Sequence, residues 1–203
     1  MIIGLHGKMG SGKSTIANKI VAVLQDQHNI KAEIKSFAQP IYKLTSILFD
    51  ESIENIKQAK HSIFRTRNYS LRSYRELLQT IGMELRDNVD IDIWIDALFG
   101  KGNSKILQDW TGGLKWWIID DLRFLNELKR IKQNGGKIIK IFRDTPDLHQ
   151  DFWKNVQNNE SEIQLDTLDN SKWDLIIDNN NPLNVSTNIV ANFIATLLTN
   201  VEK

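Results

Sequence analysis

The residues best suited to chemistry form a glycine-rich stretch near the start of the chain. Residues 7–14 read Gly-Lys-Met-Gly-Ser-Gly-Lys-Ser and fit the pattern G-x-x-x-x-G-K-[ST], between an apolar run and a helical pattern. The glycines let backbone N–H groups turn toward an anion, and the start of the helix adds a partial positive charge. The spacing therefore predicts a loop that binds the phosphates of a nucleotide.

Within this loop each polar side chain has an expected task. Lys13 would reach the β and γ phosphates of ATP, Ser14 would bind Mg²⁺, and Thr15 would assist at the α phosphate. For Lys8, a solvated position in the loop is at least as compatible with the sequence as a contact with phosphate. The residues expected to bind ATP are Gly7, Lys8, Gly10, Ser11, Gly12, Lys13, Ser14 and Thr15.

Two carboxylates follow an apolar run in the middle of the chain. Asp120 and Asp121 come directly after Trp-Trp-Ile-Ile, so they end a strand expected beside the phosphate loop. Either carboxylate could hold Mg²⁺ through water or contact the phosphoryl acceptor. No glutamate follows a strand-end aspartate to activate water, and the base-reading N/T-K-x-D segment of GTPases is missing. The pattern therefore favours phosphoryl transfer over hydrolysis.

A polar stripe borders the apolar face of a long helical pattern. Arg75, Gln79, Gly82 and Arg86 are spaced i, i+4, i+7 and i+11, which places them along one side of a helix. Guanidinium groups suit a phosphate, an amide suits the edge of a base, and a glycine permits close approach. The stripe predicts an acceptor-binding edge, with an ordinary solvated helix face as the alternative.

Alternating apolar runs and helical patterns surround these residues. Strands are expected at residues 2–6, 32–37, 116–121, 137–142 and 173–178. Helices are expected from residue 13, after Pro40, from a Ser70 cap through residue 85, over 92–99, from Leu122 to a stop at 134–136, and over 185–201. Residues 50–68 and 143–170 are polar and weakly patterned, as is typical of mobile lids. Strands separated by helices indicate an α/β fold with a parallel sheet covered on both faces.

Composition narrows the class of protein. The chain has 203 residues, of which 41% are hydrophobic and 25% charged, as expected of one globular domain over residues 1–203. The formal net charge of +1 gives no basic field for a nucleic-acid polymer, and there is no cysteine for a disulfide or thiolate site. No run predicts a signal peptide or a membrane span, so a cytoplasmic location is expected.

At this point the sequence resembles the deoxynucleoside-monophosphate kinases of bacteriophage type, a branch of the P-loop nucleoside-monophosphate kinases. The matching stretches are residues 4–15, 36–43, 75–82 with Arg86, 92–94, 119–127 and 135–143, and residues 160–162 and 178–180 look like late signatures of the family. The segments R-x-x-L-Q-x-x-G and D-x-R-x-x-N-E are more specific than the phosphate loop. The matches occur in the family's order over most of the chain.

The resemblance implies a P-loop kinase fold with a five-stranded parallel sheet in the order 2-3-1-4-5, an acceptor-binding region at residues 50–100 and a lid at 143–170. It also implies transfer of the γ-phosphoryl of ATP, with Mg²⁺, to a deoxynucleoside monophosphate, in the host cytoplasm if a phage encodes the protein. The catalytic set would be Lys13, Asp121, Arg123 and Arg143, with Mg²⁺ held by Ser14 and by Asp120 or Asp121 through water. The acceptor set would be Phe37, Arg75, Gln79, Arg86, Trp94, Asp121, Arg123 and Glu162.

Several alternatives stay open at the level of the sequence. Gln39 stands where the family usually has aspartate and Met83 where it often has threonine, so the range of bases is open. Dephospho-coenzyme A kinases share a similar first strand and loop, although residues 120–127 lack their Pro-Leu-Leu-Phe-Glu run. An ATP-binding regulatory module is a third reading, which the stripe disfavours. Arg123 could pair with Asp121 instead of a phosphoryl group, His6 is expected to be structural, and a homodimer is compatible with the sequence.

Overall fold

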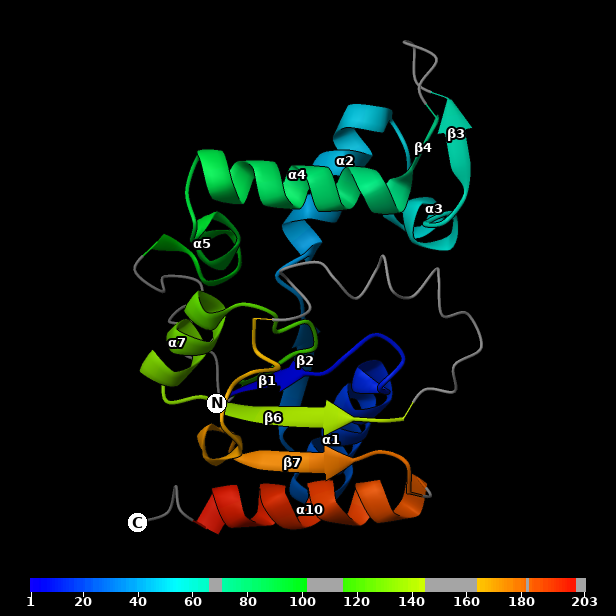
Figure 1. Ribbon diagram of the computed structural model, residues 1–203. Coiled ribbons are helices and arrows are strands. Elements are labelled where there is room, and N and C mark those ends of the chain that lie inside the picture. The colour runs from blue at the N-terminus through cyan, green and yellow to red at the C-terminus, as the bar shows by residue number, and fades with distance from the viewer. Residues whose placement is uncertain (66–70, 102–114, 145–163, 182, 200–203) are drawn as a thin grey trace. The chain divides into compact units, whose positions relative to one another are not determined.

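The computed structural model describes residues 1–65, 71–101, 115–144, 164–181 and 183–199 (Figure 1). The chain divides into two compact units. The first contains Met1–Ser36 and Gln108–Lys203, and the second contains Phe37–Leu107. None of the helices within the described ranges is long and apolar enough to cross a membrane.

The first unit is built on a five-stranded parallel sheet. Its strands are β1 (Ile2–His6), β2 (Lys31–Lys35), β5 (Lys115–Ile119), β6 (Lys137–Phe142) and β7 (Leu175–Asp178). They lie in the order β2-β5-β1-β6-β7, and every neighbouring pair is parallel. Counted along the chain, these five strands have the order 2-3-1-4-5, which confirms the predicted α/β architecture. The carboxyl ends of all five strands therefore lie along one edge.

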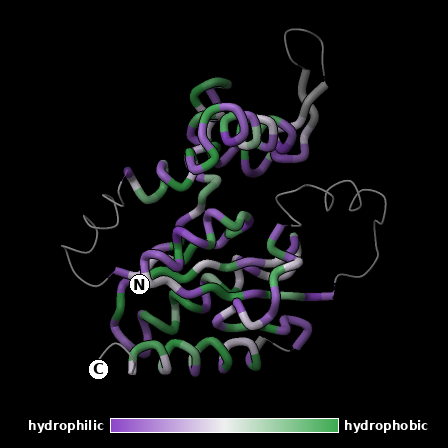
Figure 2. The backbone as a smooth tube through the Cα atoms, turned by 60° about the vertical axis from the view of Figure 1, so that its left-hand side comes forward, coloured by the Kyte–Doolittle hydropathy of each residue, from purple (hydrophilic) through white to green (hydrophobic). Residues whose placement is uncertain are grey.

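Helices cover both faces of this sheet. On one face, side chains of α1 (Lys13–His28) and α10 (Leu183–Thr199) pack with Ile3 and Leu5 in one buried apolar cluster. The apolar residues of α10 recur among polar ones, as the colours of Figure 2 show. On the other face, α7 (Leu125–Gln133) brings Ile131 so close to Gly4 that a Cβ there would lie 2.6 Å from Ile131 Cδ1. Because successive strand residues point to opposite faces, Ile3 and Gly4 meet different helices.

The second unit contains four helices and a short antiparallel pair of strands within its described residues. The elements are α2 (Gln39–Phe49), α3 (Ile53–Gln58), β3 (Ile63–Arg65), β4 (Leu71–Ser73), α4 (Tyr74–Asn88) and α5 (Ile93–Phe99). Pro40 lies in the first turn of α2, where its missing N–H costs no helical hydrogen bond.

The predicted start of the long helix was wrong. Helix α4 begins at Tyr74, whereas residues 71–73 form β4, and Ser70 lies outside the described residues. Ser73 is the N-cap, because its Oγ accepts from the Glu76 N–H at 3.2 Å and Glu76 Oε2 accepts from the Ser73 N–H at 2.7 Å. This reciprocal pair satisfies two N–H groups at the helix start, which Ser70 cannot do for a helix that begins at Tyr74.

Residues 50–65, the described part of the first predicted lid, hold more regular structure than a mobile lid suggests, and residues 66–68 lie outside the described residues. Ser52 caps α3 by accepting from the Asn55 N–H at 3.1 Å, and Ile56 of this helix is fully buried. Strand β3 then pairs with β4. A single buried isoleucine in a six-residue helix is too weak a periodic signal to be recognised along the chain.

Other boundaries moved by a few residues. Strand β2 ends at Lys35 rather than at residue 37, and α7 begins at Leu125 rather than at Leu122. Helix α7 starts late because of the buried side chain of Glu127. Its Oε2 accepts from the N–H groups of Arg123 and Phe124 at 2.8 and 3.0 Å. These bonds hold the residues before α7 in a turn.

Candidate phosphate-binding and acceptor sites

The phosphate loop joins the end of β1 to the start of α1. Two of its glycines adopt backbone conformations that other residues rarely adopt, as expected from the sequence. Gly10 and Gly12 have φ values of 83° and 93°, in the left-handed region where a side chain would be strained. A Cβ on Gly7 would lie 2.2 Å from the Ile141 carbonyl oxygen. The loop therefore requires glycine at these positions.

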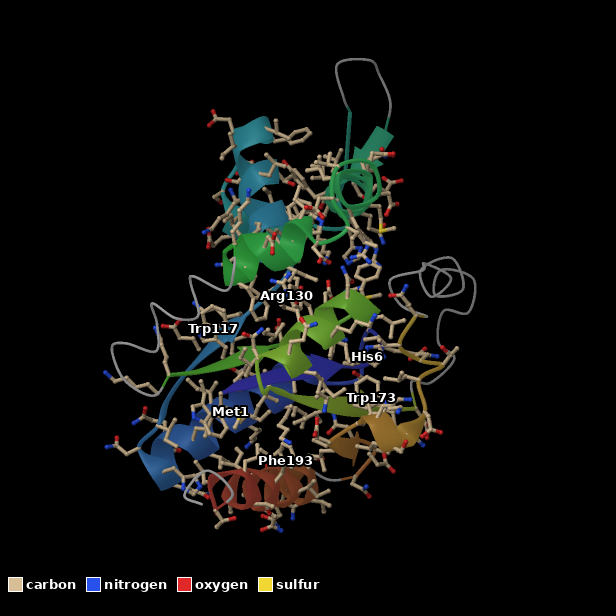
Figure 3. All side chains as sticks on the ribbon, turned by 90° about the vertical axis from the view of Figure 1, so that its left-hand side faces the viewer. Met1, His6, Trp117, Arg130, Trp173 and Phe193 are labelled. Carbon is tan, nitrogen blue, oxygen red and sulfur yellow. The ribbon has the colours of Figure 1, made fainter. Side chains whose placement is uncertain are left out.

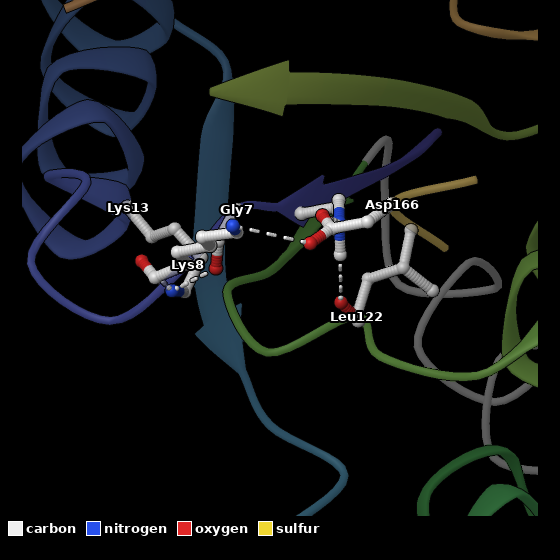
Figure 4. Close-up of polar contacts among 6 residues, drawn as sticks. Gly7, Lys8, Lys13, Leu122 and Asp166 are labelled. Carbon is white, nitrogen blue, oxygen red and sulfur yellow. Dashed lines mark hydrogen bonds and ion pairs between the residues drawn. The ribbon is translucent and has the colours of Figure 1, made fainter. Parts of the chain in front are cut away.

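Lys13 extends along this loop in the first turn of α1. Its Nζ donates to the carbonyl oxygens of Gly7 at 2.5 Å and Lys8 at 2.9 Å (Figure 4). The ammonium group is thus held against the loop backbone by two bonds that a phosphate could replace. This is the placement expected of a lysine that neutralises phosphate charge.

The buried hydroxyl of Ser11 gives a test of whether the loop suits an anion. Ser11 is 1% exposed, and its Oγ has no hydrogen-bond partner among the described residues. An unsatisfied buried hydroxyl costs about 1–3 kcal/mol. A donor in this position fits the phosphate-binding role predicted for the loop.

The two strand-end aspartates lie at the same edge of the sheet as the loop. Strand β5 pairs with β1 at Ile119 and Gly4, and with β2 at Ile119 and Lys35. Beyond the pairing, Ser36 Oγ donates to Asp121 Oδ2 at 2.7 Å. Ser36 was not recognised as an orienting residue from the sequence, because its partner is 85 residues away.

These carboxylates also fit a magnesium ion. Mg²⁺ is usually bound by one or two carboxylates together with substrate phosphates and waters, rather than by a complete protein cage. No cluster of three or more histidine, aspartate or glutamate side chains that could hold a metal ion is found where the chain is described. Ser14 and the pair Asp120 and Asp121 supply the hydroxyl and carboxylate donors that such a site needs.

His6, the last residue of β1, is buried as expected of a structural residue. Its Nδ1 lies 3.0 Å from the Leu122 carbonyl oxygen and its Nε2 lies 3.3 Å from Asp166 Oδ1 (Figure 4). Burial lowers the pKa of His6, and the nearby Lys13 lowers it further, whereas Leu122 and Asp166 oppose the shift without cancelling it. Asp166 also faces Lys8, with 3.6 Å between Oδ2 and Nζ. Asp166 is a neighbour of the phosphate loop that the sequence did not reveal.

Three of the predicted acceptor residues are buried within the second unit. Phe37 stacks on Phe99, with 6.0 Å between ring centroids. Trp94 Nε1 donates to the Gly82 carbonyl at 2.8 Å, and Arg86 Nη1 donates to the Ile91 carbonyl at 3.2 Å. Phe37, Arg86 and Trp94 therefore have partners inside this unit.

The remaining acceptor residues are more accessible or lie elsewhere. Arg75 and Gln79 are half-buried on α4. The close approach permitted by Gly82 is to α2, since a Cβ there would lie 3.2 Å from Ile41 Cδ1. Arg143 is exposed just after β6, and Glu162 lies outside the described residues. Arg123 is half-buried in the turn that Glu127 holds.

The sheet order, with a phosphate loop directly after the first strand, defines a P-loop kinase fold. The resemblance found in the motifs is confirmed by a curated relative from Acanthamoeba polyphaga mimivirus, named "Putative deoxynucleotide monophosphate kinase". It is 28% identical over 198 residues, which cover 89% of this chain and 89% of the relative. No family model matches the chain.

Two solved structures are also similar over most of the chain. A gluconokinase from Sinorhizobium meliloti 1021 has 14% identity and a TM-score of 0.45, and covers 98% of this chain and 94% of its own. A dephospho-CoA kinase from Campylobacter jejuni has 16% identity and a TM-score of 0.40, and covers 96% of each chain. At such low scores neither likeness carries weight for the substrate.

Proposed function

We propose that this protein is an ATP-dependent kinase that transfers the γ-phosphoryl group to a deoxynucleoside monophosphate, which yields a deoxynucleoside diphosphate and ADP. The observation that carries the proposal is the geometry of the phosphate loop, in which Lys13 is held against the glycine backbone by the Gly7 and Lys8 carbonyls. The name of the mimivirus relative supports the class of acceptor.

In this proposal Lys13 exchanges its two carbonyl partners for oxygens of the β and γ phosphates. The start of α1 and the backbone N–H groups of the loop bind the same anion, and Thr15 assists at the α phosphate. Phosphoryl transfer needs positioning and charge neutralisation more than covalent chemistry. These groups therefore supply the main catalytic requirement at the donor.

Magnesium would be held by Ser14 and by Asp120 or Asp121 through water, and it would neutralise charge on the phosphates. Ser36 orients the Asp121 carboxylate by the hydrogen bond described above. On the acceptor side, Arg75 would bind the monophosphate and Gln79 the edge of the base. Arg123, Arg143 and the lid at residues 143–170 would complete the neutralisation and exclude water from the transferring group.

A coupled assay of ATP consumption tests the proposal. The purified protein is given ATP and Mg²⁺ with each deoxynucleoside monophosphate, each ribonucleoside monophosphate, dephospho-coenzyme A, or no acceptor. We expect consumption that depends on one or more deoxynucleoside monophosphates, with the matching diphosphate as product. Turnover with dephospho-coenzyme A alone, or turnover independent of any acceptor, would contradict the proposed function.

A further inference from the structure

Asn179, the residue that follows β7, reaches from the last strand to the phosphate loop. Its backbone N–H donates to the Phe142 carbonyl at 2.9 Å, which continues the pairing of β7 with β6. Its side-chain Nδ2 donates to the Ser11 carbonyl at 2.9 Å, across 168 positions of sequence. Asn179 is only 9% exposed, so this amide lies inside the fold.

The orientation of this amide is determined by two different partners. The carbonyl of Ser11 can only accept, so it selects the NH₂ end of the Asn179 side chain. At the other end, Ser186 Oγ of α10 donates to Asn179 Oδ1 at 3.2 Å, and Ser186 is fully buried. A rotated amide would place Asn179 Oδ1 against the Ser11 carbonyl oxygen, so two acceptors would face each other inside a buried site.

This contact controls a peptide plane of the loop. In a trans peptide the C=O and N–H point in opposite directions, so binding of the Ser11 carbonyl turns the Gly12 N–H away from Asn179. A phosphate cannot approach from the Asn179 side, because a Cβ on Gly12 would already lie 2.2 Å from Nδ2. The Gly12 N–H therefore points away from the side that the Asn179 amide occupies.

We propose that Asn179 is a positioning residue for phosphate binding, which holds the Ser11–Gly12 peptide in the orientation that binds the nucleotide before ATP arrives. This inference rests on the proposed function, since it requires that the loop bind ATP. It adds that the start of α10 and the end of β7, through Ser186 and Asn179, determine the affinity for the phosphates.

The test compares the same chemical change at two neighbouring positions. Asn179→Asp replaces the Nδ2 donor with an oxygen that faces the Ser11 carbonyl, whereas Asn180→Asp makes this change at an exposed residue whose side chain binds Asp144. Calorimetry measures the affinity for ATP with Mg²⁺, and competition with ATP measures that for inorganic triphosphate. Thermal melting confirms that each variant is folded.

Asn179→Asp should bind both ATP and triphosphate about ten- to a hundred-fold more weakly, as expected for an acceptor placed against a buried acceptor. Its KM for the monophosphate should stay within about twofold of wild type, and Asn180→Asp should keep the wild-type affinities. If Asn179→Asp does not fold, Ser186→Ala takes its place. That variant removes the second hydrogen bond that holds the Asn179 side chain and should weaken the binding of both ligands about fivefold.

Unchanged affinity in Asn179→Asp, or in Ser186→Ala where it replaces that variant, would overturn the inference while the proposed function stands. So would a loss for ATP without a loss for triphosphate, because the amide would then act on the sugar or base. If Asn180→Asp lost as much affinity for ATP and triphosphate as Asn179→Asp, the added negative charge would explain the effect, and the inference would be overturned. If the wild-type protein binds neither ATP nor triphosphate, the proposed function fails and this inference fails with it.

Discussion

The ring of His6 lies flat against the indole of Trp173, with 5.2 Å between centroids and 18° between planes (Figure 3). His6 ends β1 directly before the phosphate loop, and Trp173 precedes β7. Lys140 of the intervening strand β6 places its Nζ 5.8 Å from the centroid of the same indole. The start of the phosphate loop is therefore anchored to the last strand region by a buried aromatic pair.

The buried state of His6 predicts a loss of stability in mild acid. Burial, the largest effect, lowers the pKa of His6 in the folded protein. Between the ordinary histidine pKa of about 6.5 and this lower value, the unfolded chain binds the proton first, so acidification favours unfolding. Urea titrations at several pH values in this range should show that the free energy of unfolding decreases as the pH is lowered.

A His6→Gln variant should lose this part of the pH dependence, so its free energy of unfolding should fall less than that of the wild type on acidification. Stability that rises on acidification through the same range would show that Asp166 and Leu122 outweigh burial.

Lys13→Ala should reduce turnover by about a hundred-fold or more, because one preorganised group that stabilises transition-state charge is worth that much. The melting temperature should change little, since the Lys13 ammonium donates to the Gly7 and Lys8 carbonyls of the loop and the residue is not part of the buried apolar cluster. Steady-state rates at saturating ATP and Mg²⁺ measure the effect. Lys19→Ala, on the same helix but beyond the loop, serves as the control. Full activity of Lys13→Ala would refute the assignment of this loop.

Asp174 should contribute stability that disappears in acid. Burial raises the pKa of Asp174, but hydrogen bonds from Lys132 and the Ile138 N–H, with the charges of Lys132 and Lys137, outweigh it and lower the pKa overall. The stabilisation is therefore fully present above the ordinary carboxyl pKa of about 4 and is lost as the pH falls through the lowered value.

At neutral pH, Asp174→Asn should lower the free energy of unfolding by about 1 kcal/mol, because a partly exposed ion pair is weakened while the Ile138 N–H keeps an acceptor. Chemical denaturation at several pH values should show the gap between variant and wild type closing below pH of about 4. A gap that stays constant through this range would assign the effect to packing instead of charge.

Arg75 and Gln79 should separate binding of the acceptor from binding of ATP. A charge-assisted hydrogen bond contributes about 1.5–3 kcal/mol, so Arg75→Ala should lower kcat/KM for the monophosphate about ten- to a hundred-fold. The KM for ATP should hardly change. Gln79→Ala should alter the ranking among bases, because only the bases that pair with the amide lose a bond. The stripe would not be the acceptor site if Gln79→Ala lowered kcat/KM equally for the monophosphates of every base. The same would follow if Arg75→Ala impaired the use of ATP as much as the use of the monophosphate.

Much of this architecture could be predicted from local pattern. Residues 7–14 encode the phosphate loop because glycines, a lysine and a serine at this spacing satisfy a local backbone requirement that is the same in any fold. The apolar runs of β1, β5 and β6 identify buried strands, and the order of the five strands followed from the resemblance. In contrast, the cap of α4 depended on which serine has a glutamate three residues later, a local cue that favours Ser73 over Ser70.

Tertiary structure alone decided which distant side chains support the site. Ser11 meets Asn179, Ser36 meets Asp121, and His6 meets Asp166, across 168, 85 and 160 positions of sequence. No periodicity relates such residues, because their contact arises from the parallel alignment of strands and from the turns that follow them. The sequence by itself determined that a loop for phosphates exists. The packing of strand ends against that loop determined how its backbone is held, since hydrogen bonds between remote residues form only once the sheet has aligned them.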